Sequence, residues 1–286
     1  MNIAIVGPGA IGSTFALRLA QAGHAVTVIA RGKRLAQLQR DGAIVTRGGA
    51  RAPVQVRSAL EPGTAWDLVL VTVLATQVDA VLPALAASAA KTVMFMFNTV
   101  APLDPLRDVV GAPRFAFGFP AVLATLDEDG ALTTQTFRHG QITTVTDAAW
   151  AQVFTAAGIP TVVHDDMQSW LRTHAALVVP FMITSVLSHR RQAGLSWAQA
   201  LHLARALHEG FALVLRLGSA ITPAPLALIR RAPAPLLASL LWISSRLAAV
   251  RKMGVLGPSE PRALIDAMAA LSPGQTPLLR AAQSWL

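Results

Sequence analysis

A glycine-rich motif near the start of the chain is the strongest indication of chemistry in this sequence. Gly7-Pro8-Gly9-Ala10-Ile11-Gly12 fits the pattern G-x-G-x-x-G and lies between an apolar run and a segment of helical periodicity. In that context Gly7 permits a tight turn, Gly9 lets the backbone approach a pyrophosphate, and Gly12 lets helix and strand pack closely. The helix N-terminus, with Ala10 and Ile11, would offer N–H groups and a partial positive charge to the phosphates. A strand–helix turn without a ligand is the alternative.

The residues after the second predicted strand indicate which dinucleotide is bound. A site for NAD normally carries an acid about 20 residues after the glycines, where it holds the ribose hydroxyls. This chain has Ala30-Arg31-Gly32-Lys33-Arg34 at that point, and no acid before Asp41. Arg31, together with Lys33 or Arg34, would bind a 2′-phosphate, so the sequence predicts NADP(H). A solvated basic turn is the alternative.

The elements that position this motif alternate between strands and helices. Short apolar runs predict parallel strands, with helical segments crossing between them on both faces of one sheet. These runs are Asn2 to Val6, Ala25 to Ala30, Leu68 to Val73, Thr92 to Phe97 and Arg114 to Phe119. Asp127-Glu128-Asp129-Gly130 predicts a hairpin within 123–145, followed by a helix at 148–157 and a strand at 160–163.

Strand signals are absent from the sequence after Asp165. Asp165 or Asp166 is a plausible N-cap for a helix that runs to about Leu187 and that Pro180 would kink. Helices are also predicted at 197–217, 236–250 and 260–271. The predicted fold class is therefore α/β: an N-terminal Rossmann domain with a doubly wound parallel sheet (1–165), then an all-helical C-terminal domain (166–286).

Composition excludes several kinds of chemistry. Hydrophobic residues make up 53% of the 286 residues, and there is no cysteine and no tyrosine. The chain therefore has no disulfide, thiolate nucleophile or phenolic proton donor, and without an HExxH motif we predict no metal site. No stretch supplies the roughly 20 apolar residues of a membrane-spanning helix, and no basic leader opens the chain. We expect a soluble, cytoplasmic protein without a transmembrane segment.

The charge is uneven along the chain. Residues 167–286 contain 12 Lys+Arg and 3 Asp+Glu, a balance of +9, whereas residues 1–166 are neutral. This balance indicates either an attraction for an anionic ligand or solvated arginines. No basic run is interleaved with aromatic residues, so nucleic acid is not expected as a partner. The apolar stretch from Leu236 to Leu247, with Trp242, indicates core or a homodimer face rather than a membrane anchor.

The chain resembles the ketopantoate reductase family over essentially its whole length. The shared features are the Gly7–Gly12 motif, the turn at Arg31, Gln77 after the third strand and Asn98 after the fourth. Weaker matches are Trp170 and the Ser259-Glu260 pair. The resemblance implies reduction of a 2-oxo acid carbonyl by NADPH, with Gln77 and Asn98 in the cofactor site and Glu260 near the substrate. The Asn98 amide could hold either the ribose or the substrate, and an ordinary turn residue is its alternative.

Several polar positions of the family differ here. The resemblance places a catalytic lysine two residues after the tryptophan, where this chain has Arg172, and asparagines at Ala176 and Pro180. Arg172 could clamp a carboxylate and polarise a carbonyl, and His174 could donate a proton near neutral pH. Two residues along a helix span about 200°, so both side chains cannot face one carbonyl.

Each of the three catalytic candidates has an alternative. Arg172 could be a surface arginine, His174 a capped or core histidine, and Glu260 the N-terminal acid of a helix. The predicted function is an NADPH-dependent reductase of a small, anionic carbonyl (2-oxo acid-like) or imine substrate, which is an oxidoreductase of the class that acts on CH–OH or C=N groups. One alternative is an NADP-binding sensor or assembly protein without hydride transfer, and a weaker one is a lipid-associated enzyme.

Overall fold

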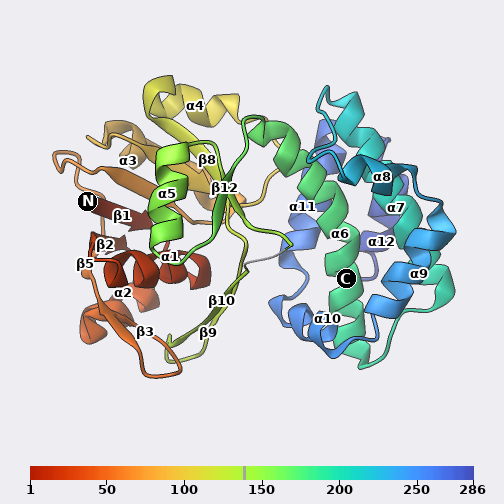
Figure 1. Ribbon diagram of the computed structural model, residues 1–286, viewed down its shortest axis with the longest axis horizontal. Coiled ribbons are helices and arrows are strands. Elements are labelled where there is room, and N and C mark those ends of the chain that lie inside the picture. The colour runs from red at the N-terminus through yellow and green to blue at the C-terminus, as the bar shows by residue number, and fades with distance from the viewer. Residues whose placement is uncertain (138–139) are drawn as a thin grey trace. The chain divides into compact units, whose positions relative to one another are not determined.

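The protein consists of two compact units (Figure 1). The structure is a computed structural model that describes residues 1–137 and 140–286. The α/β unit comprises Met1–Asn98 and Leu103–Met167, and the helical unit comprises Thr99–Pro102 and Gln168–Leu286. The sequence did not indicate that four residues from the first half of the chain belong to the helical unit.

A mostly parallel eight-stranded sheet forms the centre of the α/β unit, in the order β12-β11-β8-β7-β6-β1-β2-β5. Its strands are β1 (Asn2–Val6), β2 (Ala25–Ile29), β5 (Gln55–Arg57), β6 (Leu68–Val71), β7 (Val93–Met96), β8 (Phe115–Phe119), β11 (Thr143–Val145) and β12 (Thr161–Val163). Ile5 of β1 pairs with Val28 on one side and Leu70 on the other, both in parallel register. Only β11 runs antiparallel to its neighbour β8. The predicted Rossmann fold class is confirmed.

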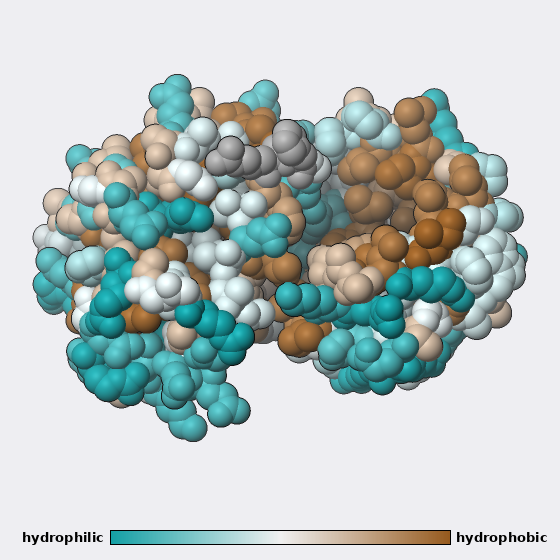
Figure 2. All heavy atoms as spheres, turned by 60° about the horizontal axis from the view of Figure 1, so that its bottom comes forward, coloured by the Kyte–Doolittle hydropathy of each residue, from teal (hydrophilic) through white to brown (hydrophobic). Residues whose placement is uncertain are grey.

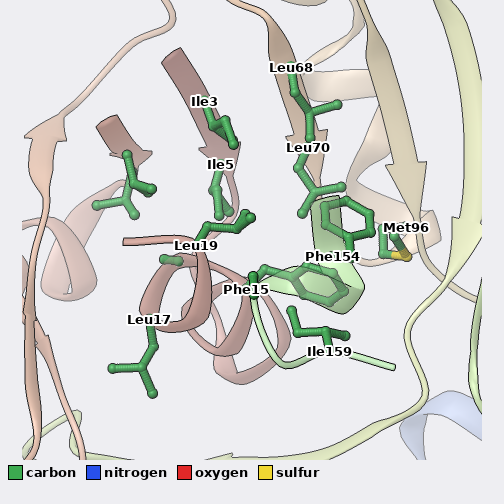
Figure 3. Packing of buried hydrophobic residues seen from close by; sticks show 14 of the residues in the cluster. Ile3, Ile5, Phe15, Leu17, Leu19, Leu68, Leu70, Met96, Phe154 and Ile159 are labelled. Atoms are coloured by element: carbon green, nitrogen blue, oxygen red, sulfur yellow. The ribbon is translucent and has the colours of Figure 1, made fainter. Parts of the chain in front are cut away.

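The core of this unit lies between the sheet and two of its helices. The helical elements are α1 (Ala10–Gln21), α2 (Gly32–Asp41), η1 (Ala75–Ala80), α3 (Leu82–Ala87), α4 (Asp104–Val110), η2 (Ala112–Arg114) and α5 (Ala148–Ala156). Figure 3 shows Ile5 and Leu70 from the strands beside Phe15 of α1 and Phe154 of α5. The rings of Phe15 and Phe154 meet edge to face at 5.2 Å. Burial of these side chains removes apolar surface from water and fixes α1 on the sheet.

Short strands complete the α/β unit. The predicted hairpin is present as β9 (Val122–Leu126) and β10 (Leu132–Thr136), which pair antiparallel around the Asp127–Gly130 turn. The hydroxyl of Thr14 donates to the Thr134 hydroxyl at 2.8 Å, which links α1 to this hairpin. The ribbon β3 (Ala43–Val45) with β4 (Arg51–Pro53) was not predicted, and neither was β5, because three-residue strands carry too little pattern to read.

The helical unit contains no strand among its described residues. Its elements are α6 (Met167–Arg191), α7 (Trp197–Arg216), α8 (Leu226–Arg231), α9 (Ala234–Ser244), α10 (Ala248–Met253), η3 (Gly254–Leu256), α11 (Ser259–Leu271) and α12 (Pro277–Gln283). The single helix predicted at 236–250 is wrong, because the chain breaks between α9 and α10. At that break the Ser245 hydroxyl donates a hydrogen bond to the Trp242 carbonyl and accepts one from the Leu195 N–H.

Helix α6 is the long central helix of this unit and has Pro180 in its interior. By length and composition, it is the one helix in the described chain that could cross a membrane, with a mean hydropathy of 1.4 over its most apolar window. However, 78% of that window is buried inside the protein, and a core helix meets the same criterion. Its Ala176 packs tightly on α7, since a Cβ added at Gly210 would lie 3.0 Å from the Ala176 Cβ.

Candidate active site

The glycine motif forms the connection between β1 and α1, and its three glycines have different surroundings. Gly7 has a φ of +86°, and a Cβ there would lie 2.6 Å from Cγ1 of Val73. A Cβ at Gly12 would lie 2.4 Å from Oγ1 of Thr72. A Cβ at Gly9 would meet nothing within 4 Å. The outer two glycines are therefore required by packing, whereas Gly9 borders open space from which a ligand can approach the backbone.

The N-terminus of α1 is available for a negatively charged group. Gly9 is the N-cap, and among the described residues no side chain caps the helix by a hydrogen bond. The Ser13 hydroxyl donates instead to the Pro8 carbonyl at 3.0 Å. The N–H groups of the first turn, which begins at Ala10 and Ile11, therefore combine with the helix dipole as an anion site.

The position of this loop in the sheet is the one expected for a ligand site. Strand β1 lies between β2 and β6, and chain order reverses there. Ligands of open α/β sheets bind beyond the carboxyl ends of strands at such a reversal. The Thr72 hydroxyl, just beyond the end of β6, donates to the Gly7 carbonyl at 2.8 Å and holds the loop against the neighbouring strand.

The Arg34 side chain forms hydrogen bonds to the glycine loop, to α1 and to the turn between β9 and β10. Its Nε donates to the Pro8 carbonyl at 2.9 Å, its Nη2 to the Ser13 hydroxyl at 2.6 Å, and its Nη1 to the Gly130 carbonyl at 3.0 Å. Burial lowers the pKa of the Arg34 guanidinium, and the nearby Asp41 carboxylate opposes that shift. The expectation that Arg34 contributes to a 2′-phosphate site is therefore not supported by its contacts. This positioning role was not predicted from the sequence, because the partners of Arg34 are distant in the chain.

Arg31 and Lys33 are the exposed basic groups at the end of β2. Arg31 is the N-cap residue of α2, with an extended backbone, and Lys33 lies in the first turn of that helix. The first turn of α2 contains no acid. Both side chains are thus available to an anion at the edge of the sheet where the glycine loop lies.

Gln77 and Asn98 follow the two strands next to β1. Gln77 lies in η1, which begins soon after β6, and its Oε1 accepts from the Leu74 N–H at 3.3 Å. Asn98 is half-buried and comes two residues after the end of β7. Because β1, β6 and β7 are adjacent and parallel, the glycine loop, Gln77 and Asn98 all lie at one edge of the sheet.

Arg172 is buried in the helical unit, so the alternative of a surface arginine is wrong. Its side chain donates from Nε to the Val100 carbonyl at 3.1 Å. Its Nη1 donates to the Leu217 carbonyl at 3.0 Å and to the Ser219 hydroxyl at 2.9 Å. The guanidinium therefore links α6 to the 99–102 segment and to the chain that leaves α7.

His174 stacks on Trp170 one helical turn earlier, with ring centroids 5.2 Å apart and planes at 10°. Desolvation by burial lowers the pKa of His174 to about 3. The imidazole is therefore neutral at neutral pH, which argues against the expectation that it donates a proton there. The position fits the alternative of a core histidine. Arg172 and His174 have different contacts on α6, as their 200° separation predicts.

Glu260 lies in the first turn of α11, directly after Pro258 and Ser259, and is half-buried. Its position matches the alternative of an N-terminal helix acid, which stabilises the positive end of the dipole. Among the described residues, no three His, Asp or Glu side chains are grouped so that they could hold a metal ion.

The glycine loop, the switch-point sheet and the following helical unit define a protein with a Rossmann-type fold and a second, helical part. Residues 3–146 match the family described as "Ketopantoate reductase PanE/ApbA". This match covers half of the chain, and the chain belongs to that family. The resemblance inferred from the sequence is confirmed.

A curated relative and several solved structures are similar to this chain. The 2-dehydropantoate 2-reductase of Vibrio cholerae serotype O1 (strain ATCC 39315 / El Tor Inaba N16961) is 34% identical over 128 residues. That match covers 44% of this chain and 39% of the Vibrio protein, so it spans well under half of the relative's length.

The solved structures show the same fold over nearly the whole chain. A PanE/ApbA family ketopantoate reductase from Ralstonia eutropha JMP134 has a TM-score of 0.74 at 22% identity, covering 99% of this chain and 96% of that one. A D-mandelate dehydrogenase solved with NADH has a TM-score of 0.74 at 15% identity, covering 100% and 97%. At these identities the likeness concerns the fold.

Proposed function

We propose that this protein is an NADPH-dependent reductase of a small anionic carbonyl compound, of the 2-oxo acid type, or of an imine. The observation that carries the proposal is the open space at Gly9, between two glycines that packing requires, at the uncapped N-terminus of α1. Membership of the ketopantoate reductase family supports the same activity.

The proposal names NADPH because of the residues beyond β2. Arg31 and Lys33 are exposed, and no acid precedes Asp41 in this segment. Two basic groups attract a 2′-phosphate, whereas the acid typical of NAD sites would repel it. The structural neighbour solved with NADH has the same fold, so these side chains and not the fold would select the cofactor.

In this proposal the nicotinamide supplies the hydride, and the chain's own residues bind and orient the reactants. The glycine loop and the first turn of α1 hold the pyrophosphate, with Gln77 and Asn98 at the same sheet edge. The charge balance of +9 over residues 167–286 favours an anionic substrate. Arg172 remains the proposed group for orienting and polarising the carbonyl, and Glu260 remains the proposed group that handles the proton. His174, being neutral, is the weakest of the three.

The decisive experiment compares two glycine variants of the α/β unit. A Cβ at Gly9 and a Cβ at Gly63 both meet nothing within 4 Å, and neither residue has a positive φ. Neither Gly9→Ala nor Gly63→Ala should therefore change the melting temperature. Only Gly9→Ala should weaken NADPH binding, by tenfold or more, because its methyl group occupies the space of the pyrophosphate. Titration of NADPH fluorescence measures the Kd.

Two results would contradict the proposal. The first is a wild-type protein that does not bind NADPH, or a Gly9→Ala variant with the wild-type Kd. The second is a Kd for NADH equal to or below that for NADPH, which would overturn the assignment to NADPH. Arg31→Ala should raise the Kd for NADPH selectively, since it removes a charge that only the 2′-phosphate engages.

The contacts on α6 favour a second candidate function, an NADP-binding sensor or assembly protein without hydride transfer. Arg172 donates to three groups of its own chain, and the neighbouring His174 is neutral. This candidate predicts tight NADPH binding without oxidation of NADPH in the presence of any 2-oxo acid, ketone or imine. Absorbance at the reduced nicotinamide band distinguishes the two functions.

A further inference from the structure

Large apolar side chains are exposed over one stretch of the helical unit. Six of them are more than half exposed: Leu228 (66%), Leu236 (54%), Leu240 (58%), Ile243 (55%), Leu247 (53%) and Val255 (61%). They belong to α8, α9, η3 and the break before α10. Elsewhere in the described chain only Met1 and Leu74 are as exposed. Figure 2 shows brown, apolar residues gathered on the surface of the helical unit.

Helix α9 is apolar on both its buried and its exposed sides. Leu237, Ala238 and Leu241 are buried in the core of the helical unit. Leu236, Leu240 and Ile243 recur at intervals of four and three residues and therefore share the opposite, solvent-facing side. The sequence predicted core or a homodimer face for this stretch, and burial confirms core for the first set only. A surface helix normally presents polar residues at the second set of positions.

Basic residues flank this apolar side, and acids are absent from the whole region. Arg230 and Arg231 end α8 just before α9, and Arg246 and Lys252 follow α9; all four are exposed. The sequence contains no Asp or Glu between Glu209 and Glu260. The Arg246 guanidinium lies over the Trp242 ring, 3.5 Å from its centroid. Apolar side chains bordered by Arg, Lys and Trp are the composition of a helix that lies in a membrane interface.

We propose that the exposed side of α9, together with the basic residues that precede and follow this helix, binds the face of an anionic phospholipid membrane. Leu236, Leu240 and Ile243 would enter the boundary between headgroups and acyl chains, and Arg230 and Arg231 would bind lipid phosphates. Arg246 donates to the carbonyls of Trp242 and Leu195 and adds to the positive charge beside the helix. Adsorption of this kind needs both the apolar area and the positive charge. This proposal differs from a membrane-spanning segment, since α9 has only 11 residues.

The charge of the surface favours lipid over a second copy of the chain. A symmetric dimer joins the same surface of two subunits. A dimer through α9 would join two copies of a segment that has basic residues at both ends and no acid between Glu209 and Glu260 in the sequence. Like charges across an interface oppose association. An anionic bilayer provides the complementary charge as well as an apolar phase.

Flotation of the full-length protein with vesicles tests the proposal. The protein should float with vesicles of phosphatidylcholine and phosphatidylglycerol at low salt, and should remain unbound with phosphatidylcholine alone. Raising the salt to about 0.5 M should release it, because screening weakens the attraction between arginine and phosphate. Arg230→Glu with Arg231→Glu should lower the partition coefficient by about thirtyfold or more, since each basic residue contributes roughly fivefold.

A matched pair of double variants separates the contribution of the apolar side chains to membrane binding from the effect of the added negative charge. Leu236→Glu with Leu240→Glu should abolish flotation. Val162→Glu with Val163→Glu makes the same charge change at apolar residues of β12 that are 45% and 43% exposed, and should leave most of the flotation. Circular dichroism of each variant confirms that it is folded.

Three results would overturn the proposal. One is the absence of flotation with anionic vesicles under any condition. Another is flotation that Leu236→Glu with Leu240→Glu does not reduce. The third is a lipid-free dimer, seen by light scattering, that these two substitutions convert to a monomer. That result would assign the surface to an interface between copies. None of these outcomes depends on the reductase activity.

Discussion

Replacement of Arg172 by alanine should destabilise the helical unit strongly. The guanidinium donates to the carbonyls of Val100 and Leu217 and to the hydroxyl of Ser219, at 3.1, 3.0 and 2.9 Å. Arg172 is 8% exposed and Ser219 is 6% exposed, so these groups lie largely out of reach of water. Alanine removes these three donated hydrogen bonds, which leaves the buried Val100 carbonyl and Ser219 hydroxyl and the partly buried Leu217 carbonyl without the guanidinium.

The expected loss can be estimated from the three acceptors. A buried acceptor that loses its partner costs about 1–3 kcal/mol, and hydrogen bonds from charged groups lie at the upper end. Water that enters the space left by the side chain recovers part of this cost, and contributions within one network are not additive. We therefore expect Arg172→Ala to lower the free energy of unfolding by about 3 kcal/mol.

Urea denaturation followed by tryptophan fluorescence measures this loss. Four of the six tryptophans, Trp170, Trp197, Trp242 and Trp285, lie in the helical unit. With a slope of about 2 kcal/mol per molar urea, the midpoint should fall by about 1.5 M. Arg205→Ala is the matched control, because Arg205 is an exposed arginine in α7 and its replacement should change stability by less than about 0.5 kcal/mol.

Replacement of Arg172 by lysine should have an intermediate effect on the free energy of unfolding. Arg172→Lys keeps the charge but replaces a planar fork by a single ammonium, so it should recover only part of the lost stability. An Arg172→Ala protein with the wild-type urea midpoint would refute the argument that these hydrogen bonds stabilise the unit. If its turnover nevertheless collapsed while NADPH affinity was unchanged, Arg172 would act in catalysis alone.

His174, Gly12 and Arg34 each allow a further test. Because burial lowers the pKa of His174 to about 3 while the unfolded chain titrates near 6.5, stability should fall as the pH drops below about 6.5. Between pH 7 and pH 5 this loss amounts to about 2 kcal/mol, and it should vanish from the urea midpoints of His174→Phe. Gly12→Ala should cost about 1–3 kcal/mol in thermal melts, because its Cβ would lie 2.4 Å from Oγ1 of Thr72; an unchanged melting temperature would refute the packing argument. Arg34→Ala should weaken the binding of NADPH and NADH to a similar degree, whereas Arg31→Ala should weaken NADPH alone, and equal effects of the two variants would contradict their separate roles.

The sequence predicted the α/β unit well because its signals are local. Buried parallel strands read as short apolar runs, and a glycine motif between a strand and a helix fixes the first turn of the fold. The helical unit was predicted less completely. Prolines in or beside α8 and α12 interrupt the helical pattern in the sequence, so these two helices were not predicted. The break at Ser245 depends on a hydrogen bond to Leu195, which lies 50 residues away.

The candidate site shows the same limit. Gly7, Gly9 and Gly12 are recognisable in the sequence because their spacing, between an apolar run and a helical segment, is that of a dinucleotide-binding motif. Arg31 and Arg34 look equivalent in the sequence, and only tertiary structure shows that Arg34 is occupied by Pro8 and Ser13. In the same way, spacing on α6 could not show that Arg172 is buried.

The segment Thr99–Pro102 has a consequence for how the helical unit can be studied. Val100 is 2% exposed and belongs to the hydrophobic core of that unit, although it precedes the rest of the unit by more than 60 residues. A fragment that begins at Gln168 would lack this side chain and the carbonyl that Arg172 requires. During synthesis these four residues leave the ribosome long before residues 168–286. The hydrophobic core of the helical unit is therefore built from two segments that are separate in the chain. A fragment that begins at Gln168 should therefore not fold by itself unless a separate peptide containing Val100 is added.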